Sequence, residues 1–420
     1  MTQVSSSNIK REFIYLILLG LVLVTATLGY RINSVSIILM ALFYVSDKNL
    51  IAKVKTIPFK VFYFYLGYFV LHLLGLLYTE NIDKGSQEVT VKLAFLILPL
   101  VIFTEKVSKD NLNQLFVFFK YWLISIGVFL IYHKLVVIGG PLFTLPSISL
   151  ARLIGVHHSY YSLFYIFTLF FLFHQVNTKR IGVILGFVQI LFFIFFIALL
   201  GARVIFIMAI LFAILFFLKR IANEKGSKRI LFLGVFLVSV FMVIQSTNVP
   251  EKFSRLTKVE WNLDKNIYNH QVFTFGYDEK TSNTLEMRLI KWYCSLEIIK
   301  KQPILGVGTG DYQDELFKKY HEIDFKKGMV YNYNTHNQFI EEFLKFGIVG
   351  GIFFILFFVF IIYQSIKLKN ELLLYSTLTF CAFLFIESAF ERQHGVLFFT
   401  LFITLAYVYN PRILNQSERD

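Results

Sequence analysis

Long apolar runs alternate with short polar turns along almost the whole chain. Most runs approach the ~20 residues that a helix needs to cross the hydrocarbon core of a bilayer. Runs such as Ile190–Leu200 are apolar at every position. The alternation of a membrane β-barrel strand is therefore absent, and the pattern predicts helices. Twelve spans are predicted, at roughly 13–29, 33–46, 58–78, 89–103, 114–138, 158–174, 181–200, 203–218, 230–246, 347–364, 372–388 and 395–410.

The composition agrees with this pattern. Of the 420 residues, 56% are hydrophobic and only 16% are charged, whereas a soluble domain is nearer 45–50% apolar. We therefore predict an all-α polytopic membrane protein. Three parts are expected: a transmembrane bundle of spans one to nine over 1–246, a polar loop over 247–346, and spans ten to twelve with a tail over 347–420.

The net charge of +14 is distributed unevenly. Basic residues gather in alternate loops, as the positive-inside rule expects, so both termini are predicted to be cytoplasmic. The basic loop residues are Lys48, Lys53, Lys55, Lys106, Lys109, Lys179, Arg180, Lys219, Arg220, Lys225, Lys228, Arg229, Lys367 and Lys369. No basic helix or aromatic-basic strand of a nucleic-acid module is present, so a nucleic-acid partner is not expected. Lys10 and Arg11 before an apolar run indicate a retained signal anchor.

The 247–346 loop is then expected outside the cytoplasm, and much of it is predicted to be helical. Leu285, Leu289, Trp292, Leu296 and Ile299 recur at helical spacing. Pro303 and the following glycines should end that helix. A second short helix is expected over Asp311–Tyr320. Asn334 or Thr335 is expected to cap a third helix, which begins near His336 and continues into span ten. The segment 260–283 shows no usable periodicity.

Two arginines on the external side are candidates for binding an anion. Arg203 follows Gly201-Ala202 between apolar runs, where a charge usually faces a cavity or a partner, although it can also extend to the membrane interface. Arg288 precedes Trp292 by one helical turn, and a solvated arginine is the simpler interpretation there. Guanidinium groups suit diphosphates because they are planar, charged and bidentate.

His336 is the candidate general base. It lies in Asn334-Thr335-His336-Asn337, at a predicted helix start. A neutral imidazole can take a proton from an attacking hydroxyl, whereas a lone histidine is often only a capping or packing residue. The glycine-rich run Gly306–Gly310 lacks the GK[ST] ending of a phosphate loop, so it is interpreted as a turn that lets the backbone pass close to another segment.

Further polar residues are expected on the same external side. Arg152, His158, Glu387 and Arg392 are possible supporting residues, with structural pairing or lipid-phosphate binding as the alternatives. His157-His158 has no partner at metal-ligand spacing, and the only cysteines, Cys294 and Cys381, form no metal motif. No metal site and no cofactor are predicted.

At these residues the chain resembles the O-antigen ligase family. The similar pieces are Gly-Ala-Arg203, Arg288-x-x-x-Trp292, the run Gln302–Gly308, the pair His336-Asn337, and Glu-Phe-Leu-Lys-Phe-Gly-Ile-Val-Gly before span ten. Ala202 stands where the common form of the first motif has serine. The superfamily also contains O-antigen and exopolysaccharide polymerases and O-linked protein oligosaccharyltransferases.

The resemblance implies a GT-C-type glycosyltransferase of the bacterial inner membrane, with one large periplasmic helical loop between spans nine and ten. The implied donor is a glycan on undecaprenyl diphosphate, and the implied acceptor is the lipid A–core saccharide. Arg203 and Arg288 would hold the diphosphate, His336 would activate the acceptor hydroxyl, and Asn337 and Trp292 would support them. The implied transfer is metal-independent. The single-displacement logic of inverting glycoside chemistry adds inversion of the anomeric carbon.

Other functions are compatible with the same residues. A polymerase would join one lipid-linked glycan to another, and an oligosaccharyltransferase would glycosylate protein. A membrane transporter is the alternative from another class, because transporters also carry buried charges. Its charges would be expected near the bilayer midplane, between broken helices, rather than at one face.

Overall fold

The computed structural model describes residues 6–139, 153, 155–223, 226, 229–230, 232–234, 237, 259–271 and 284–410, apart from a few side chains. Every regular element in these residues is a helix, as predicted. The N-terminal half contains α1 (Ser6–Ala26), α2 (Tyr30–Val45), α3 (Leu50–Val54), α4 (Phe59–Gly75), η1 (Leu76–Tyr78), α5 (Ile82–Lys92), α6 (Ala94–Thr104), α7 (Lys109–Tyr132), η2 (His133–Ile138), α9 (His158–Asn177), α10 (Val183–Leu200) and α11 (Arg203–Asn223).

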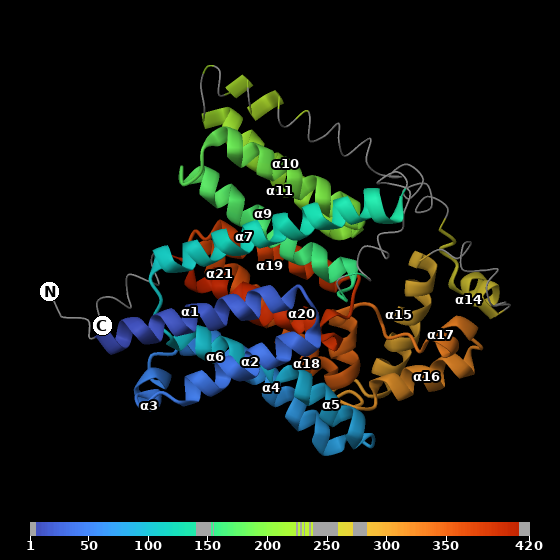
Figure 1. Cartoon of the computed structure of the whole chain (residues 1–420). Helices are drawn as coiled ribbons and strands as arrows, with labels where there is room; N and C mark the ends of the chain where they lie inside the picture. The colour runs from blue at the N-terminus through green and yellow to red at the C-terminus, as the bar shows by residue number, and fades with distance from the viewer. Residues whose placement is uncertain are drawn as a thin grey trace.

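The C-terminal half contains both short amphipathic helices and long apolar ones. They are α14 (Leu263–Gln271), α15 (Thr284–Lys301), α16 (Tyr312–Glu322), α17 (Lys326–Tyr331), α18 (Gln338–Lys367), α19 (Glu371–Leu384), η3 (Ala389–Glu391), α20 (Gln393–Leu397), η4 (Phe398–Ile403) and α21 (Thr404–Val408). In Figure 1, α14 to α17 lie beyond one end of the bundle of apolar helices, at the right of the view.

Six helical segments in the described part of the chain are long and apolar enough to cross a membrane. They are Lys60–Tyr78, Ile82–Thr104, Lys109–Ile138, Val183–Leu200, Arg203–Asn223 and Gln338–Lys367. Shorter apolar helices cover Tyr30–Val45, Glu371–Leu384 and Gln393–Val408. Each predicted span except 230–246, which falls mostly outside the described residues, coincides with helical structure. The count of twelve crossings stays a prediction.

The bundle is organised around α9. Its side chains are buried on all sides from Tyr160 to Phe173, and α10, α11, α19 and α7 pack around it. Aromatic rings fill the core, as in the stacked pair Phe173 and Phe216 with centroids 4.4 Å apart. An all-round apolar helix of this kind is typical of the centre of a membrane bundle.

A smaller apolar core holds α15 to α17 together outside the bundle. It contains Ile290, Cys294, Ile298, Val307, Tyr312, Leu316, Tyr320, Phe325 and Leu344. The predicted helix over 285–299 is confirmed, but its predicted apolar face is only partly correct. Leu296 is 48% exposed, whereas Ile290, Cys294 and Ile298 form the buried side.

The glycine-rich turn after α15 packs tightly against α18, as the sequence predicted. The backbone N–H groups of Val307 and Gly308 donate to the carbonyls of Leu344 and Lys345 at 3.0 and 2.9 Å. A Cβ atom on Gly306 would collide with the α18 backbone. Gly347 has φ 60° and ψ −154° and kinks α18 at this crossing. The turn and the kink fix where α18 enters the bundle.

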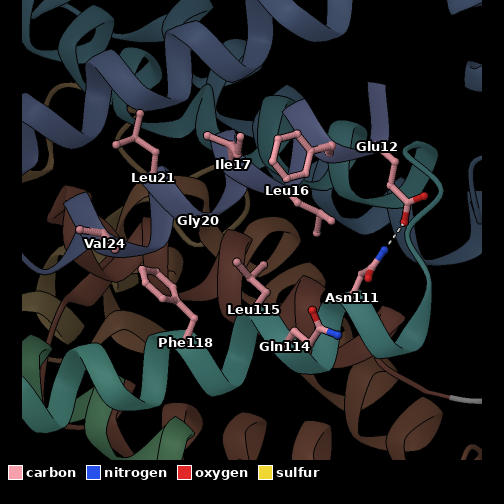
Figure 2. Close-up of a pocket in the computed structure, with 11 residues that line it drawn as sticks. Glu12, Leu16, Ile17, Gly20, Leu21, Val24, Asn111, Gln114, Leu115 and Phe118 are labelled. Carbon is pink, nitrogen blue, oxygen red and sulfur yellow. Dashed lines mark hydrogen bonds between the residues drawn. The ribbon is translucent and has the colours of Figure 1, made fainter. Parts of the chain in front are cut away.

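A groove of about 630 Å³ lies between α1 and α7. Figure 2 shows Leu16, Ile17 and Leu21 of α1 facing Leu115 and Phe118 of α7, with the Glu12–Asn111 hydrogen bond at its polar end. None of its lining residues belongs to the predicted site.

Candidate functional site

His336 lies in the short segment between α17 and α18. Its backbone is left-handed, with φ 49°, and its N–H donates to Asn334 Oδ1 at 3.2 Å. The helix begins after it: Asn337 is the N-cap of α18, and its Oδ1 accepts from the N–H of Ile340 at 3.2 Å. The prediction that Asn334 or Thr335 caps this helix is therefore wrong. The helix continues into span ten, as predicted.

Glu387 is the direct partner of His336. The Nδ1 of His336 lies 3.2 Å from Glu387 Oε2, and the two side chains are 29% and 22% exposed. Glu387 follows α19, so the pair joins the start of α18 to the end of α19. Tyr160, near the start of α9, donates from its hydroxyl to Glu387 Oε1 at 3.4 Å.

The surroundings of this pair act on both titrating groups. Burial lowers the pKa of His336; the hydrogen bond to Glu387 opposes this, while Lys291 and Arg288 lower the pKa further, and the net shift is downward. Burial raises the pKa of Glu387, but His336 and nearby positive charges outweigh it, so the net shift of this pKa is also downward. The pair therefore holds a neutral imidazole and an ionised carboxylate near pH 7.

Arg288 and Trp292 point from α15 toward the same two segments. The Nη2 of Arg288 donates to the carbonyl of Ile386 at 3.1 Å, next to Glu387. Trp292 Nε1 donates to the carbonyl of Thr335 at 3.1 Å, next to His336. Both residues lie on one side of α15 because they are four positions apart. The helix thus holds the two loops that carry the pair.

Arg203 is the first residue of α11 and is exposed. Gly201 takes the left-handed conformation that ends α10, with φ 71°, so the chain reverses tightly before it. Burial is the largest effect on the pKa of Arg288, which is lowered; Glu387 raises it and the charge of Arg203 lowers it. The two guanidinium groups are therefore within electrostatic range of each other. We call Arg203, Arg288, Lys291, His336 and Glu387 the polar cluster.

The remaining predicted residues have different positions. His158 begins α9, and its ring centroid is 4.2 Å from that of His157. Arg392 is exposed at the start of α20. Burial is the largest cause of the lowered pKa of His157, and the charge of Arg392 lowers it further. Glu387 acts on His157 in the opposite sense, so the start of α9 borders the polar cluster. Arg152 lies outside the described residues.

A buried network of side-chain hydrogen bonds connects the two loops that carry His336 and Glu387. The hydroxyls of Thr335 and Ser388 are 3.0 Å apart, and both donate to Glu341 Oε2. The network ties the residue before His336 to the residue after Glu387. It was not predicted, because Ser388 is 47 positions from Glu341 and 53 from Thr335, and the sequence gives no sign that they meet.

A second buried group, the ion cluster, consists of Glu88, Lys92, Lys345 and Glu391. Lys345 Nζ is 2.7 Å from Glu391 Oε1, and Lys92 Nζ is 2.7 Å from Glu88 Oε2. Lys92 also donates to the carbonyl of Phe390 at 2.7 Å. Because every member is paired, the charges can remain buried. The cluster connects α5, α18 and η3, the segment that follows Glu387.

The apolar helices of the described residues indicate a multi-pass helical membrane protein, and its polar cluster lies where α15 packs against α18. Residues 187–355 match the family described as O-antigen ligase. Over this region the chain is similar to that family, and the match supports a glycosyltransferase or ligase type of enzyme. No curated protein matches the chain.

Proposed function

We propose that the protein transfers a glycan from undecaprenyl diphosphate to the lipid A–core saccharide. The observation that carries the proposal is the His336–Glu387 pair, 3.2 Å apart, beside the guanidinium of Arg288. A base and a cation are the groups that such a transfer needs at its two ends. The family match supports glycosyl transfer at a coarser level.

The proposed reaction is one displacement. The acceptor hydroxyl oxygen attacks the anomeric carbon of the donor and forms the new glycosidic bond. The bond from that carbon to the diphosphate oxygen breaks, and its electron pair leaves with undecaprenyl diphosphate. The hydroxyl proton passes to Nε2 of His336, because Nδ1 faces Glu387. Attack from the face opposite the leaving group inverts the anomeric carbon.

Arg203 and Arg288 are assigned to the diphosphate. Negative charge grows on the leaving oxygen as the bond breaks, and fixed cations stabilise it most where water is excluded. The Nε of Arg288 is buried and has no hydrogen-bond partner among the described residues. Its N–H group can therefore still donate a hydrogen bond to a phosphate oxygen. The proposal needs no metal, since the arginines supply the positive charge.

The proposed site lies on the periplasmic side of the inner membrane, with both termini in the cytoplasm. The uneven distribution of basic loop residues supports this orientation. Trp292 and Asn337 have structural roles beside the site: one holds Thr335 and the other begins α18. Membrane lipids and the lipid-linked donor are the expected partners.

The first test is transfer in vitro by purified protein in detergent with EDTA. The donor is an undecaprenyl-diphosphate glycan, and the acceptor is rough lipopolysaccharide. His336→Ala should lower the rate roughly 10²–10⁴-fold, because a positioned base contributes about that much. The exposed His321 of α16 offers the matched control, and His321→Ala should retain the rate.

The product separates the alternatives. A longer lipid-linked glycan would identify a polymerase, and glycosylated protein would identify an oligosaccharyltransferase. Solute movement across liposomes without any glycan product would favour a transporter. Wild-type transfer by His336→Ala at normal protein levels would contradict the assignment of His336.

The assignment of Arg288 has its own test in the same assay. Arg288→Ala should lower kcat roughly 10²–10³-fold, as loss of one electrostatic donor typically does. Arg288→Lys keeps a charge but cannot donate in the planar, bidentate form, so it should recover only part of the loss. Arg180→Ala, at an exposed ion pair with Asp110, is the matched control. Equal rates for the Ala variant and the wild type would contradict the assignment.

A further inference from the structure

Lys291 is a buried lysine of α15 that the proposed chemistry does not use. Lys291 is only 4% exposed. The Nζ atom lies 4.7 Å from the centroid of the Tyr333 ring. No ion pair to Lys291 occurs within the described part of the chain. A buried ammonium without a carboxylate at contact distance is costly, so the position calls for a physical reason.

The groups around Lys291 come from several elements. On α15 itself, Arg288 is one turn away. Glu387 after α19 and Glu341 of α18 act on Lys291 electrostatically, as does Arg288, and Lys291 acts on His336. Both carboxylates have other partners, since Glu387 contacts His336 and Glu341 accepts from Thr335 and Ser388.

These surroundings leave Lys291 close to losing its proton. Burial is the largest cause and Arg288 adds to it, while Glu387 and Glu341 oppose both; together they lower the pKa of Lys291 to about 7. An anion that arrives beside Arg288 would add negative charge within the same range. It would shift Lys291 toward the charged form.

We propose that Lys291, one helical turn from Arg288 on α15, is a third cation of the diphosphate site, and that it takes up a proton when a prenyl diphosphate binds. Lys291 would act by its charge without contacting the anion, so it is a positioning residue. The inference rests on the proposed function for the identity of the anion. It extends that function by predicting that donor binding is linked to proton uptake.

Proton uptake can be measured by calorimetry. Farnesyl diphosphate would be titrated into the full-length protein in detergent at pH 8, in two buffers with different ionisation enthalpies. A group with a pKa of about 7 is roughly 90% neutral at that pH, so full protonation would take up roughly 0.9 proton per ligand. Lys291→Met should abolish this uptake and weaken binding. Lys300→Met changes an exposed lysine on the same helix and should behave like the wild type.

Each outcome decides the proposal. Uptake in the wild type and in Lys300→Met, but not in Lys291→Met, supports it. Binding without net uptake by the wild-type protein overturns it, whether or not Lys291→Met folds. Equal uptake by the wild type and Lys291→Met also overturns it. The transfer assay tests the proposed function separately. Proton uptake without glycan transfer would support the anion site and contradict the glycosyltransferase. Glycan transfer without proton uptake would support the glycosyltransferase and contradict the role of Lys291.

Discussion

At the residue scale, His336 lies between groups that act on its pKa in opposite directions. Burial and the positive charges of Lys291 and Arg288 favour the neutral imidazole, whereas Glu387 favours the charged one. The net result is a base that is free to accept a proton near neutral pH. Its basicity is nevertheless maintained by the carboxylate behind it, as in other imidazole–carboxylate pairs.

Glu387→Gln tests this balance. The substitution removes the carboxylate that raises the pKa of His336 by a direct hydrogen bond, so that pKa should fall further. The acid limb of kcat/KM, which lies below pH 6.5 in the wild type because the pKa is already lowered, should move to lower pH. Because the imidazole becomes a weaker and less well oriented base, kcat should fall roughly tenfold or more.

The measurement is the pH profile of glycan transfer between pH 5 and 8. Arg392→Gln is a useful comparison, because Arg392 is exposed and is not among the groups that shift the pKa of His336. An acid limb that stays in place in Glu387→Gln would show that Glu387 does not set the basicity of His336.

The residues of the polar cluster differed in how far sequence could predict them. Arg203, Arg288 and His336 stand out as charged or titratable residues next to apolar runs. Glu387 was a candidate, but its partner was not predictable, because the two residues are 51 positions apart. Lys291 was missed. It looks like one more basic residue of an amphipathic helix, and its burial beside the Tyr333 ring depends on tertiary packing.

At the element scale, the crossing of the glycine-rich turn and α18 sets the direction of the helix that follows His336. The N–H of Ile348 donates to the carbonyl of Pro303 at 2.8 Å, next to the Gly347 kink. The conformation of Gly347 is one that essentially only glycine adopts. The turn and the entry of α18 into the bundle were predictable from glycine and proline. The cap was not, because Asn334, Thr335 and Asn337 are all good cap residues.

Gly347→Ala should therefore destabilise the fold. The new Cβ would collide with the backbone at Ile304 and would also strain the dihedral angles, and strain of this kind alone costs about 1–3 kcal/mol. The expected result is a lower midpoint of thermal unfolding in detergent. Gly182→Ala is the control, since no atom lies within 4 Å of the Cβ position and the φ of −60° is ordinary. Equal midpoints would contradict the role of this crossing.

At the scale of the whole molecule, the apolar pattern correctly predicted an all-helical fold with several helices long and apolar enough to cross a membrane. Hydropathy alone could not settle the number of crossings. Some expected spans are short helices, such as α2, and the 395–410 span is divided among α20, η4 and α21. Helices that pack against one another inside a bundle need not each cover the full thickness of the hydrocarbon.

The orientation is testable with single cysteines in a variant that lacks Cys294 and Cys381. Lys318→Cys, at a 65% exposed side chain of α16, should react with an impermeant maleimide in cells whose outer membrane is opened. Lys369→Cys, exposed between α18 and α19, should react only after lysis. Labelling of both cysteines before lysis would contradict a periplasmic α16. Labelling of Lys369→Cys alone before lysis would contradict it as well.

The position of Glu387 has a practical consequence for cloning and for alignment. The region that matches the family ends at residue 355, so it includes Arg203, Arg288 and His336 but excludes Glu387. An expression fragment cut to that region would contain the imidazole without its carboxylate partner. It would also lack Glu88, Lys92 and Glu391, so Lys345 of the ion cluster would lose the carboxylates that pair with it. Alignments of relatives should therefore extend past α19, where an acidic residue in register with Glu387 would be the feature to look for.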